Sequence, residues 1–188
     1  MGKELSDMTL EELWELFPIF LVEHDEAWRQ QYEEIEGRLN ELLSDCAVER
    51  VSHIGSTAVD GIRAKDIVDV MVELPSQSEL EKAAERLERS GFTMMSDEDE
   101  RISFNLGYTK DGFAEKVYHV HLRHVGDNDE LYFRDYLNAH PQTAKEYETL
   151  KLRLWKRFEH DRDAYTEAKT EFIKAVTAKA REEYAGRY

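Results

Sequence analysis

The sequence predicts an α/β fold of the α+β kind: a mixed, mostly antiparallel sheet of four or five strands, flanked by helices and followed by a carboxy-terminal helical segment. Two observations support this prediction. Apolar residues recur every three or four positions over residues 25–44 and again over much of 131–176, which is the period of an amphipathic helix. Short β-branched or alternating runs lie between these two stretches and have the two-residue period of strands.

In chain order, the expected elements are helices at about 10–16, 25–44 and 77–91, strands at 48–54, 67–74, 92–95, 102–108 and 116–125, and helices beginning near residues 128, 141 and 165. Thr9-Leu-Glu-Glu12 is a capping box for the first helix, and Pro141 suits the first position of a later helix. The acidic run 96–100 is expected to be a solvated loop, and the last helix to continue unbroken through residue 176.

The length suits one domain over residues 1–188, with a sheet-containing core at about 20–126 and a helical segment at about 127–185. The charge is strongly acidic, with 41 acidic against 25 basic residues and a formal net charge of −16. Since nucleic-acid affinity rests on cationic contacts with phosphates, this charge argues against a polymer partner and leaves a small nucleotide as a possible ligand.

The compartment is expected to be the cytoplasm. Cys46 is the only cysteine, so no intrachain disulfide can form. The first residues lack the pattern of a signal peptide, and the apolar patch at 16–22 is too short to span a membrane. The sequence leaves the oligomeric state open.

The strand at 67–74 contains an acid where a buried side chain is expected. Its alternate residues Val68, Val70, Val72 and Leu74 form one apolar face, and Asp69 lies on the opposite face. A buried carboxylate needs a hydrogen-bond partner, an ion pair or a cation. Asp69 is therefore a candidate metal ligand, with hydrogen bonds to backbone or arginine groups at a strand end as the structural alternative.

Two further features have the chemistry of a binding site. Gly55-Ser56 breaks the chain after a strand, where a glycine allows a ligand close to the backbone and free N–H groups can hold phosphate. His119 and His121 point to the same side of the strand 116–125, about 6.6 Å apart at strand geometry. They can join one metal site, contact phosphate or act as a general base.

Several of these segments resemble the signature of one family, and together they span about residues 20–175. They are Val22-Glu-His-Asp-Glu-Ala-Trp28, His53-Ile-Gly-Ser-Thr-Ala-Val59, Gly61, Ala64-Lys65, Ile67-Val-Asp69, His119-Val-His121 and Phe133-Arg-Asp-Tyr-Leu-Asn-Ala-His-Pro141. The family is GrpB, the glutamate-rich protein family, which by resemblance belongs to the DNA-polymerase-β-like nucleotidyltransferase superfamily. The resemblance implies a nucleotidyltransferase-like core.

The resemblance also implies roles for individual residues. Gly55, Ser56 and Thr57 would hold nucleotide phosphates, and Asp69 would bind a divalent metal. Where the superfamily has a second acid on the strand, this chain has Met71. Residues further along the chain would neutralise phosphate charge, with surface ion pairing as the alternative for several of them; they are Arg63, Lys65, Arg123, Arg134, Lys151 and, with a weaker claim, Lys169.

Glu73 does not replace the missing acid. It lies about 13 Å along the strand from Asp69, whereas paired catalytic metals sit about 3.5–4 Å apart. We expect instead that Asp69, His119 and His121 form the metal site. Such a set suits Mg²⁺ or Mn²⁺ and equally Zn²⁺ or Fe²⁺. One metal can be shared only if the Asp69 and His121 side chains lie within about 8 Å.

Three functions fit these residues. The first is an enzyme that binds a nucleoside triphosphate with a divalent metal and transfers a nucleotidyl group to a small acceptor, with Asp69 and His121 as catalytic residues. The second is a non-catalytic module that binds a nucleotide or coenzyme. Met71 favours it, as do GrpB-like segments fused to dephospho-coenzyme A kinase. The third is a metal-dependent hydrolase.

Overall fold

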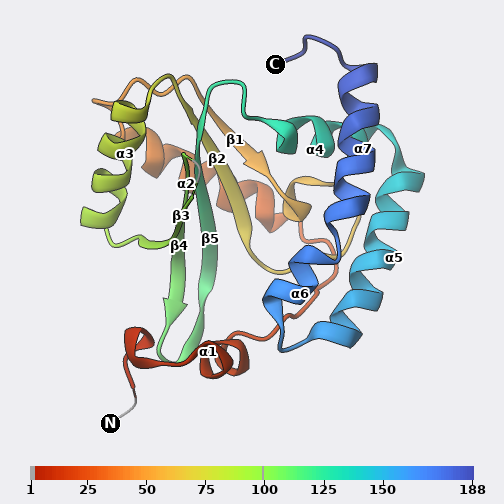
Figure 1. Ribbon diagram of the computed structural model, residues 1–188, viewed down its shortest axis with the longest axis horizontal. Coiled ribbons are helices and arrows are strands. Elements are labelled where there is room, and N and C mark those ends of the chain that lie inside the picture. Colours follow the sequence, from red (N-terminus) through yellow and green to blue (C-terminus); the bar gives the residue numbers. More distant parts are fainter. Residues whose placement is uncertain (1–2, 99) are drawn as a thin grey trace.

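A computed structural model describes residues 3–98 and 100–188 (Figure 1). The helices are α1 (Leu10–Leu16), α2 (Ala27–Leu42), α3 (Gln77–Arg89), α4 (Asp129–Ala139), α5 (Pro141–Phe158), α6 (Arg162–Glu167) and α7 (Thr170–Glu183), with short 3-10 turns η1 (Leu5–Asp7) and η2 (Ser56–Ala58). The strands are β1 (Arg50–Ile54), β2 (Val68–Leu74), β3 (Thr93–Glu98), β4 (Arg101–Thr109) and β5 (Gly112–His124).

The five strands form one mixed sheet in the order β1-β2-β5-β4-β3. Neighbours pair antiparallel except β2 and β5, which run parallel. A parallel pair needs a long crossover connection, and α3, β3 and β4 provide it. The predicted mixed, mostly antiparallel sheet is confirmed, and the strands expected at 102–108 and 116–125 form an antiparallel hairpin as β4 and β5.

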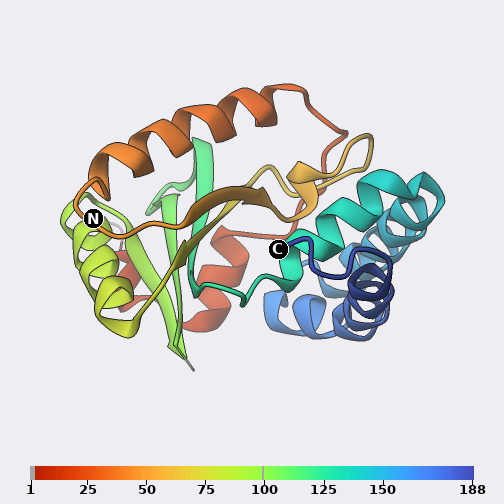
Figure 2. The ribbon, with the colours of Figure 1, turned by 90° about the horizontal axis from the view of Figure 1, so that it is seen from above.

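The main core lies on one face of the sheet. The predicted apolar face of β2 is fully buried there, at Val68, Val70, Val72 and Leu74. Two amphipathic helices cover it, and Figure 2 shows α2 passing over the sheet. Their buried contributions are Trp28, Ile35 and Leu39 from α2 and Leu80, Ala83, Ala84 and Leu87 from α3. Each set recurs at helical spacing, because one stripe of the helix must face the sheet.

The helices α4 to α7 form a second half of the molecule, on the right in Figures 1 and 2. Here α4 packs against α5 and α7. A separate apolar cluster joins these helices to the connector that follows β1; it contains Val59, Ile62, Leu137, Ala144, Tyr147 and Val176. The connector and the helical half are therefore held together by their own core. In the described part of the chain, none of the helices combines the length and apolar character needed to cross a bilayer.

Two expected elements were wrong. Of the predicted loop 96–100, residues 96–98 are the end of strand β3, and residue 99 lies outside the described residues. As an edge strand, β3 bonds its backbone to β4 while most of its side chains face solvent, so acidic residues are tolerated.

The predicted last helix is two helices, α6 and α7, which meet at Ala168 and Lys169. Tyr165 packs with Ile19 and Leu154, whereas Val176 packs in the cluster around Val59. The two helices thus bury their apolar residues in different clusters, and the chain changes direction between them.

Glu73 has a structural role. It is fully buried, accepts hydrogen bonds from Asn128 Nδ2 at 3.1 Å and the Gly126 N–H at 3.3 Å, and lies 3.0 Å from Arg50 Nε. These contacts tie β2 to β1 and to the turn before α4. The second acid of β2 therefore stabilises the sheet and its connection to the helical half.

We predict that Glu73→Gln lowers the free energy of unfolding by about 1.5–3 kcal/mol. The neutral amide no longer offers a carboxylate to Arg50, Asn128 and the Gly126 N–H. Urea unfolding monitored by circular dichroism measures the change. The control is Glu49→Gln, an exposed neighbour expected to stay within about 0.5 kcal/mol of the unmodified protein. Equal unfolding free energies for the two variants would contradict the role assigned to Glu73.

Candidate functional site

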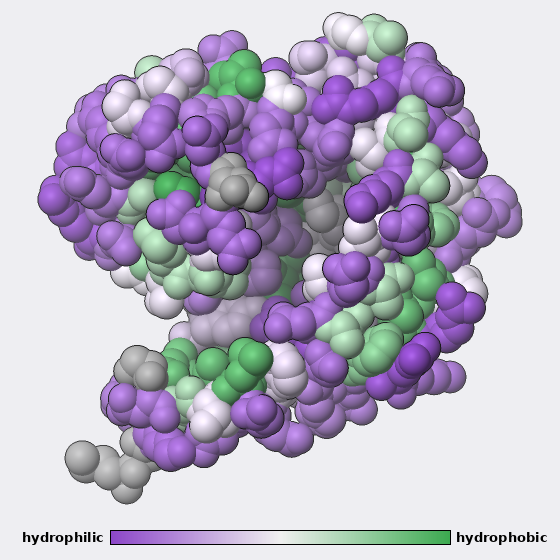
Figure 3. All heavy atoms as spheres, viewed as in Figure 1, coloured by the Kyte–Doolittle hydropathy of each residue, from purple (hydrophilic) through white to green (hydrophobic). Residues whose placement is uncertain are grey.

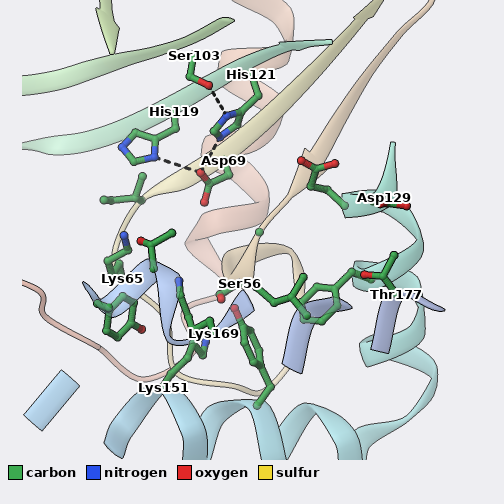
Figure 4. Close-up of a pocket in the computed structure, with 18 of the residues that line it drawn as sticks. Ser56, Lys65, Asp69, Ser103, His119, His121, Asp129, Lys151, Lys169 and Thr177 are labelled. Atoms are coloured by element: carbon green, nitrogen blue, oxygen red, sulfur yellow. Dashed lines mark hydrogen bonds and ion pairs between the residues drawn. The ribbon is translucent and has the colours of Figure 1, made fainter. Parts of the chain in front are cut away.

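The parallel pairing of β2 and β5 brings the predicted acid and histidines together. In the register of these strands Asp69 lies opposite His119, and Met71 lies opposite His121. Asp69 Oδ1 is 3.2 Å from His119 Nδ1 and 3.1 Å from His121 Nε2 (Figure 4). One ligand atom from each of the three residues lies within 4.8 Å of the others. The distance condition for a shared metal is met.

The far side of each imidazole bonds to a hydroxyl group. Ser103 Oγ lies 3.1 Å from His121 Nδ1, and the Tyr108 hydroxyl lies 3.0 Å from His119 Nε2. A hydroxyl can donate or accept, so it supports either tautomer of the ring. Such outer partners orient metal-ligating histidines. Ser103 and Tyr108 were not among the predicted site residues; their signal in the sequence was their place on the strand expected at 102–108, which pairs with the strand of His119 and His121.

Electrostatics favour a charged Asp69 beside a neutral His119. Burial alone would raise the pKa of Asp69, but hydrogen bonds from His119 and His121 hold it well below its usual range. Burial lowers the pKa of His119, against the opposing effect of Asp69. The acid therefore stays a carboxylate at neutral pH and His119 is a neutral imidazole. Both are the protonation states in which such groups bind metals.

Gly55 sits against Asp69. It has φ 73° and ψ −170°, a region almost confined to glycine, and a Cβ there would lie 2.5 Å from Asp69 Oδ2. Ser56 follows at the start of the 3-10 turn η2 and lines the cavity described next. Thr57 is buried instead: its hydroxyl donates to the Ile67 carbonyl and lies 3.0 Å from His53 Nε2. Thr57 therefore anchors the turn rather than facing the cavity.

A cavity of about 980 Å³ lies between this face of the sheet and the helical half. In Figure 3 the molecule is hollowed between its two halves, and the surface around the hollow is mostly hydrophilic. Figure 4 shows Asp69 and the two histidines on one side of the cavity and three lysines on another. The lining includes Gly55, Ser56, Lys65, Asp69, Ser103, His119, His121, Lys151, Arg162, Tyr165, Lys169 and Thr177.

The lysines make one part of the cavity cationic. Lys151 is only 1% exposed, and its ammonium donates to the Arg63 carbonyl. Lys65 and Lys169 flank the Tyr165 ring, with their Nζ atoms 6.0 and 4.4 Å from its centroid. Within the described residues, none of the three lysines has a carboxylate oxygen within the 4.0 Å of an ion pair. These cations are therefore free to bind an anion.

Burial has a large effect on these lysines. It lowers the pKa of Lys65 and of Lys151 to about 7, and that of Lys169 to about 8. Neighbouring positive charges act in the same direction, chiefly Arg162 and Lys169 on Lys65. An anion bound among these groups would favour their protonated forms.

The remaining predicted phosphate ligands lie elsewhere. Arg134 donates to the His53 carbonyl, Asp135 and the Tyr188 hydroxyl, and it does not line the cavity. Arg123 donates to the Leu122 carbonyl and lies 3.9 Å from Glu130, also outside the lining. Arg63 pairs with Glu23. The structure thus gathers Gly55, Ser56, Lys65, Lys151 and Lys169 at the cavity, adds Arg162, and leaves out Thr57, Arg63, Arg123 and Arg134.

The fold places the chain in a known structural class. The crystal structure of the Cid1 poly(U) polymerase with Mg and 3′-dATP bound matches with a TM-score of 0.53 at 10% identity, over 85% of this chain and 51% of that chain. The mixed sheet with flanking helices is therefore nucleotidyltransferase-like. At this identity the likeness concerns the fold alone.

Within that class, the chain belongs to the GrpB family, whose model, described as GrpB protein, matches residues 18–179. The glutamate-rich protein GrpB of Alkalihalophilus pseudofirmus is 33% identical over 165 residues, which cover 84% of this chain and 93% of that protein. The crystal structure of GrpB from Enterococcus faecalis matches with a TM-score of 0.75 and 28% identity, over 88% of this chain and 99% of that chain. The family predicted from the motifs is confirmed.

A longer relative contains the same kind of segment. The chain is 30% identical over 187 residues to the dephospho-CoA kinase of Mycobacterium bovis, covering 86% of this chain and 43% of that protein. A GrpB-like segment therefore occurs within a kinase of about twice its length, as the resemblance implied.

We predict that Gly55→Ala displaces Asp69, because the new Cβ would clash with its carboxylate. The matched control is Gly61→Ala, which shares a positive φ, of 69°, but has no atom within 4 Å of the added Cβ. Both variants are expected to lose about 1–2 kcal/mol to the backbone conformation. Gly55→Ala should lose a further 1–3 kcal/mol, roughly, to overpacking. Urea unfolding compares the two, and equal losses would contradict the close approach.

We predict that the protein becomes more stable as the pH rises from 7 to 9. A lysine whose folded pKa is near 7 deprotonates in the folded state over this range while the unfolded chain keeps its proton, so the unfolded state binds more protons. Lys151→Met should remove about 2 kcal/mol of this increase. Chemical unfolding at several pH values measures it, with the exposed Lys156→Met as the control. An unchanged pH slope in Lys151→Met would contradict the prediction.

Proposed function

We propose that this protein binds a nucleoside triphosphate with a divalent cation in the cavity and transfers its nucleotidyl group to a small acceptor. One observation carries the proposal: a carboxylate with two imidazoles shares a cavity with three lysines that have no acidic partner among the described residues. A metal–polyphosphate ligand needs both kinds of group at once.

The residues present fit a divalent cation. Asp69, His119 and His121 offer one carboxylate oxygen and two imidazole nitrogens, and both rings have hydroxyl partners on their far sides. This donor set suits Mn²⁺, Zn²⁺ or Fe²⁺ as readily as Mg²⁺. Met71 is fully buried against Ile54 and Leu131 and offers no ligand. When bound, the cation would neutralise charge on phosphate oxygens and orient the reacting groups.

The rest of the cavity fits the phosphate chain. Gly55 lines the cavity and packs directly against Asp69, and Ser56 presents a hydroxyl to the same cavity (Figure 4). Lys65, Lys151 and Lys169 would balance the charges of the outer phosphates. Because the site is partly shielded from water, these contacts are stronger than at an exposed surface.

In the proposed reaction, an acceptor hydroxyl oxygen forms a bond to the α-phosphorus. The bond between that phosphorus and the bridging oxygen breaks, diphosphate leaves, and the acceptor proton passes to water. The lysines stabilise the charge that develops on the leaving diphosphate. Asp69 and His121 are the residues on which we expect the rate to depend most. If water took the place of the acceptor, the same residues would support hydrolysis.

Binding without turnover is the second candidate function. It is favoured by Met71, which leaves β2 with one acid at the site where two are typical of the superfamily, and by the GrpB-like segment within a dephospho-CoA kinase. In both cases we propose a small nucleotide as the ligand. The net charge of −16 disfavours a nucleic-acid polymer at the outer surface.

We predict that ATP with Mn²⁺ raises the melting temperature and that Asp69→Asn abolishes the part of the rise that depends on metal. At a ligand concentration of 100 times Kd the gain is about 2.7 kcal/mol, or roughly 5–10 °C for a chain of this size. The other nucleoside triphosphates and Mg²⁺ complete the panel. Asp111→Asn, in the exposed hairpin turn, is the control and should behave as the unmodified protein.

Absence of any shift across the panel would contradict nucleotide binding. A shift without release of diphosphate in the presence of small alcohols and amines would favour the binding module over the transferase. Release of diphosphate that is lost in both Asp69→Asn and His121→Gln would support the transferase.

A further inference from the structure

We propose that the end of the cavity between α4 and α7 is the acceptor subsite, and that it binds a small molecule presenting hydroxyl or ammonium donors to Glu130 and Thr177. This inference deepens the proposed function and rests on it in one respect: the bound molecule is an acceptor only if the protein transfers a nucleotidyl group. The evidence for a donor-binding subsite, that is, one that binds a hydrogen-bond donor, does not depend on the transfer reaction.

The cavity has two chemically different ends. Lys169 lies at the beginning of α7, and Thr177 lies eight residues later, which is about 12 Å along the helix axis. In Figure 4 the lysines gather on one side of Asp69, whereas Thr177 and Asp129 lie on another. A ligand that holds its phosphates at the lysines therefore leaves the α4–α7 end for a second molecule.

Two polar groups at this end have unused hydrogen-bonding capacity. Thr177 is 6% exposed, lines the cavity, and its Oγ1 has no hydrogen-bond partner among the described residues. Glu130 also lines the cavity, and its buried Oε2 likewise lacks a partner within the described part of the chain, while Oε1 lies 3.9 Å from Arg123. Unpaired buried polar atoms are uncommon and costly, so each of these two atoms points to a missing partner.

The missing partner must be a hydrogen-bond donor. A carboxylate oxygen accepts only, and a threonine hydroxyl can accept as well as donate. Two other cations at this end already have acidic partners, since Arg181 pairs with Asp129 and Arg101 pairs with Asp127. Arg123 faces Glu130 from outside the cavity lining, and its buried Nε has no hydrogen-bond partner among the described residues. An alcohol or an amino alcohol would satisfy Glu130 and Thr177 and also supply the oxygen that attacks the nucleotide.

A nucleobase fits this end less well. Bases in binding sites stack on aromatic rings. At this end α4 contributes one ring, Phe133, whereas the residues that β3, β4 and α7 contribute offer no ring to stack on the opposite face of a base; they are Met95, Ser96, Arg101, Ser103, Ile173, Lys174, Thr177, Ala178 and Arg181. The tyrosines of the cavity, Tyr147 and Tyr165, lie by the lysines.

The test uses nuclear magnetic resonance on the full chain with labelled threonine methyl groups and backbone amides. Ethanolamine and glycerol are the donor-bearing probes, 1,2-dimethoxyethane is a probe without donors, and adenosine reports on base binding. We expect ethanolamine and glycerol to shift the Thr177 methyl signal while the amides of Lys151 and Lys169 stay in place. Dimethoxyethane and adenosine should leave Thr177 unchanged.

The variants Glu130→Gln and Thr177→Val should each weaken ethanolamine binding, by about tenfold or more for Glu130→Gln because it removes a charge-assisted hydrogen bond. Glu146→Gln, an exposed acid of α5 outside the cavity, is the matched control and should bind ethanolamine as the unmodified protein does. Unchanged binding in both cavity variants would overturn the subsite.

Two further results would overturn the proposal: no response of Thr177 to either donor probe, or a response to adenosine, which would make this end a base site. The thermal-shift panel with ATP and Mn²⁺ is an independent measurement. A Thr177 response without ATP binding would contradict the transfer reaction and retain the donor-binding subsite. ATP binding without a Thr177 response would retain the nucleotide site and overturn the donor-binding subsite.

Discussion

The site depends on one structural relationship, the parallel pairing of β2 with β5. It places Asp69 directly opposite His119, with His121 two residues further along β5. A single carboxylate oxygen therefore contacts both rings. A register shifted by one residue would turn the histidines to the other face of the sheet. The same pairing buries Val70 and Val120 in the main core. Core packing and site geometry therefore constrain each other.

Charge is divided between the surface and the interior. The chain has a formal net charge of −16, yet the cavity collects Lys65, Lys151 and Lys169, none of which forms an ion pair with an acid in the part of the chain that the structure describes. Buried cations destabilise a folded protein, as their lowered pKa values indicate. An arrangement that reduces stability without an ion pair to offset it is typical of a binding site. The helical half is thus more than a cover for the sheet, because α5 and the α6–α7 junction supply Lys151 and Lys169.

Much of the fold was predictable because its elements follow local rules. The helices α2 and α3 and the strands β2 and β5 have clear periodicity, and their buried faces were assigned correctly. The errors came where tertiary contacts decide. Edge pairing with β4 makes a strand of an acidic run, and two separate apolar clusters divide the last helix. Ser103 and Tyr108 belong to the site because β4 pairs beside β5. That pairing was predicted, but the contacts of the two hydroxyls with the imidazoles depend on the register of the strands and on its irregularity between Leu106 and Tyr108.

By itself the sequence determined the family, the mixed sheet and the faces on which Asp69, His119 and His121 lie, because motif residues and the two-residue strand period are local properties. Only the tertiary structure decided which cations share their cavity. Arg123 and Arg134 turn to other partners while Lys169 and Arg162 join Lys65 and Lys151. The physical reason is that a long basic side chain reaches several possible partners from one backbone position. The choice among them depends on the packing of helices far apart in the chain.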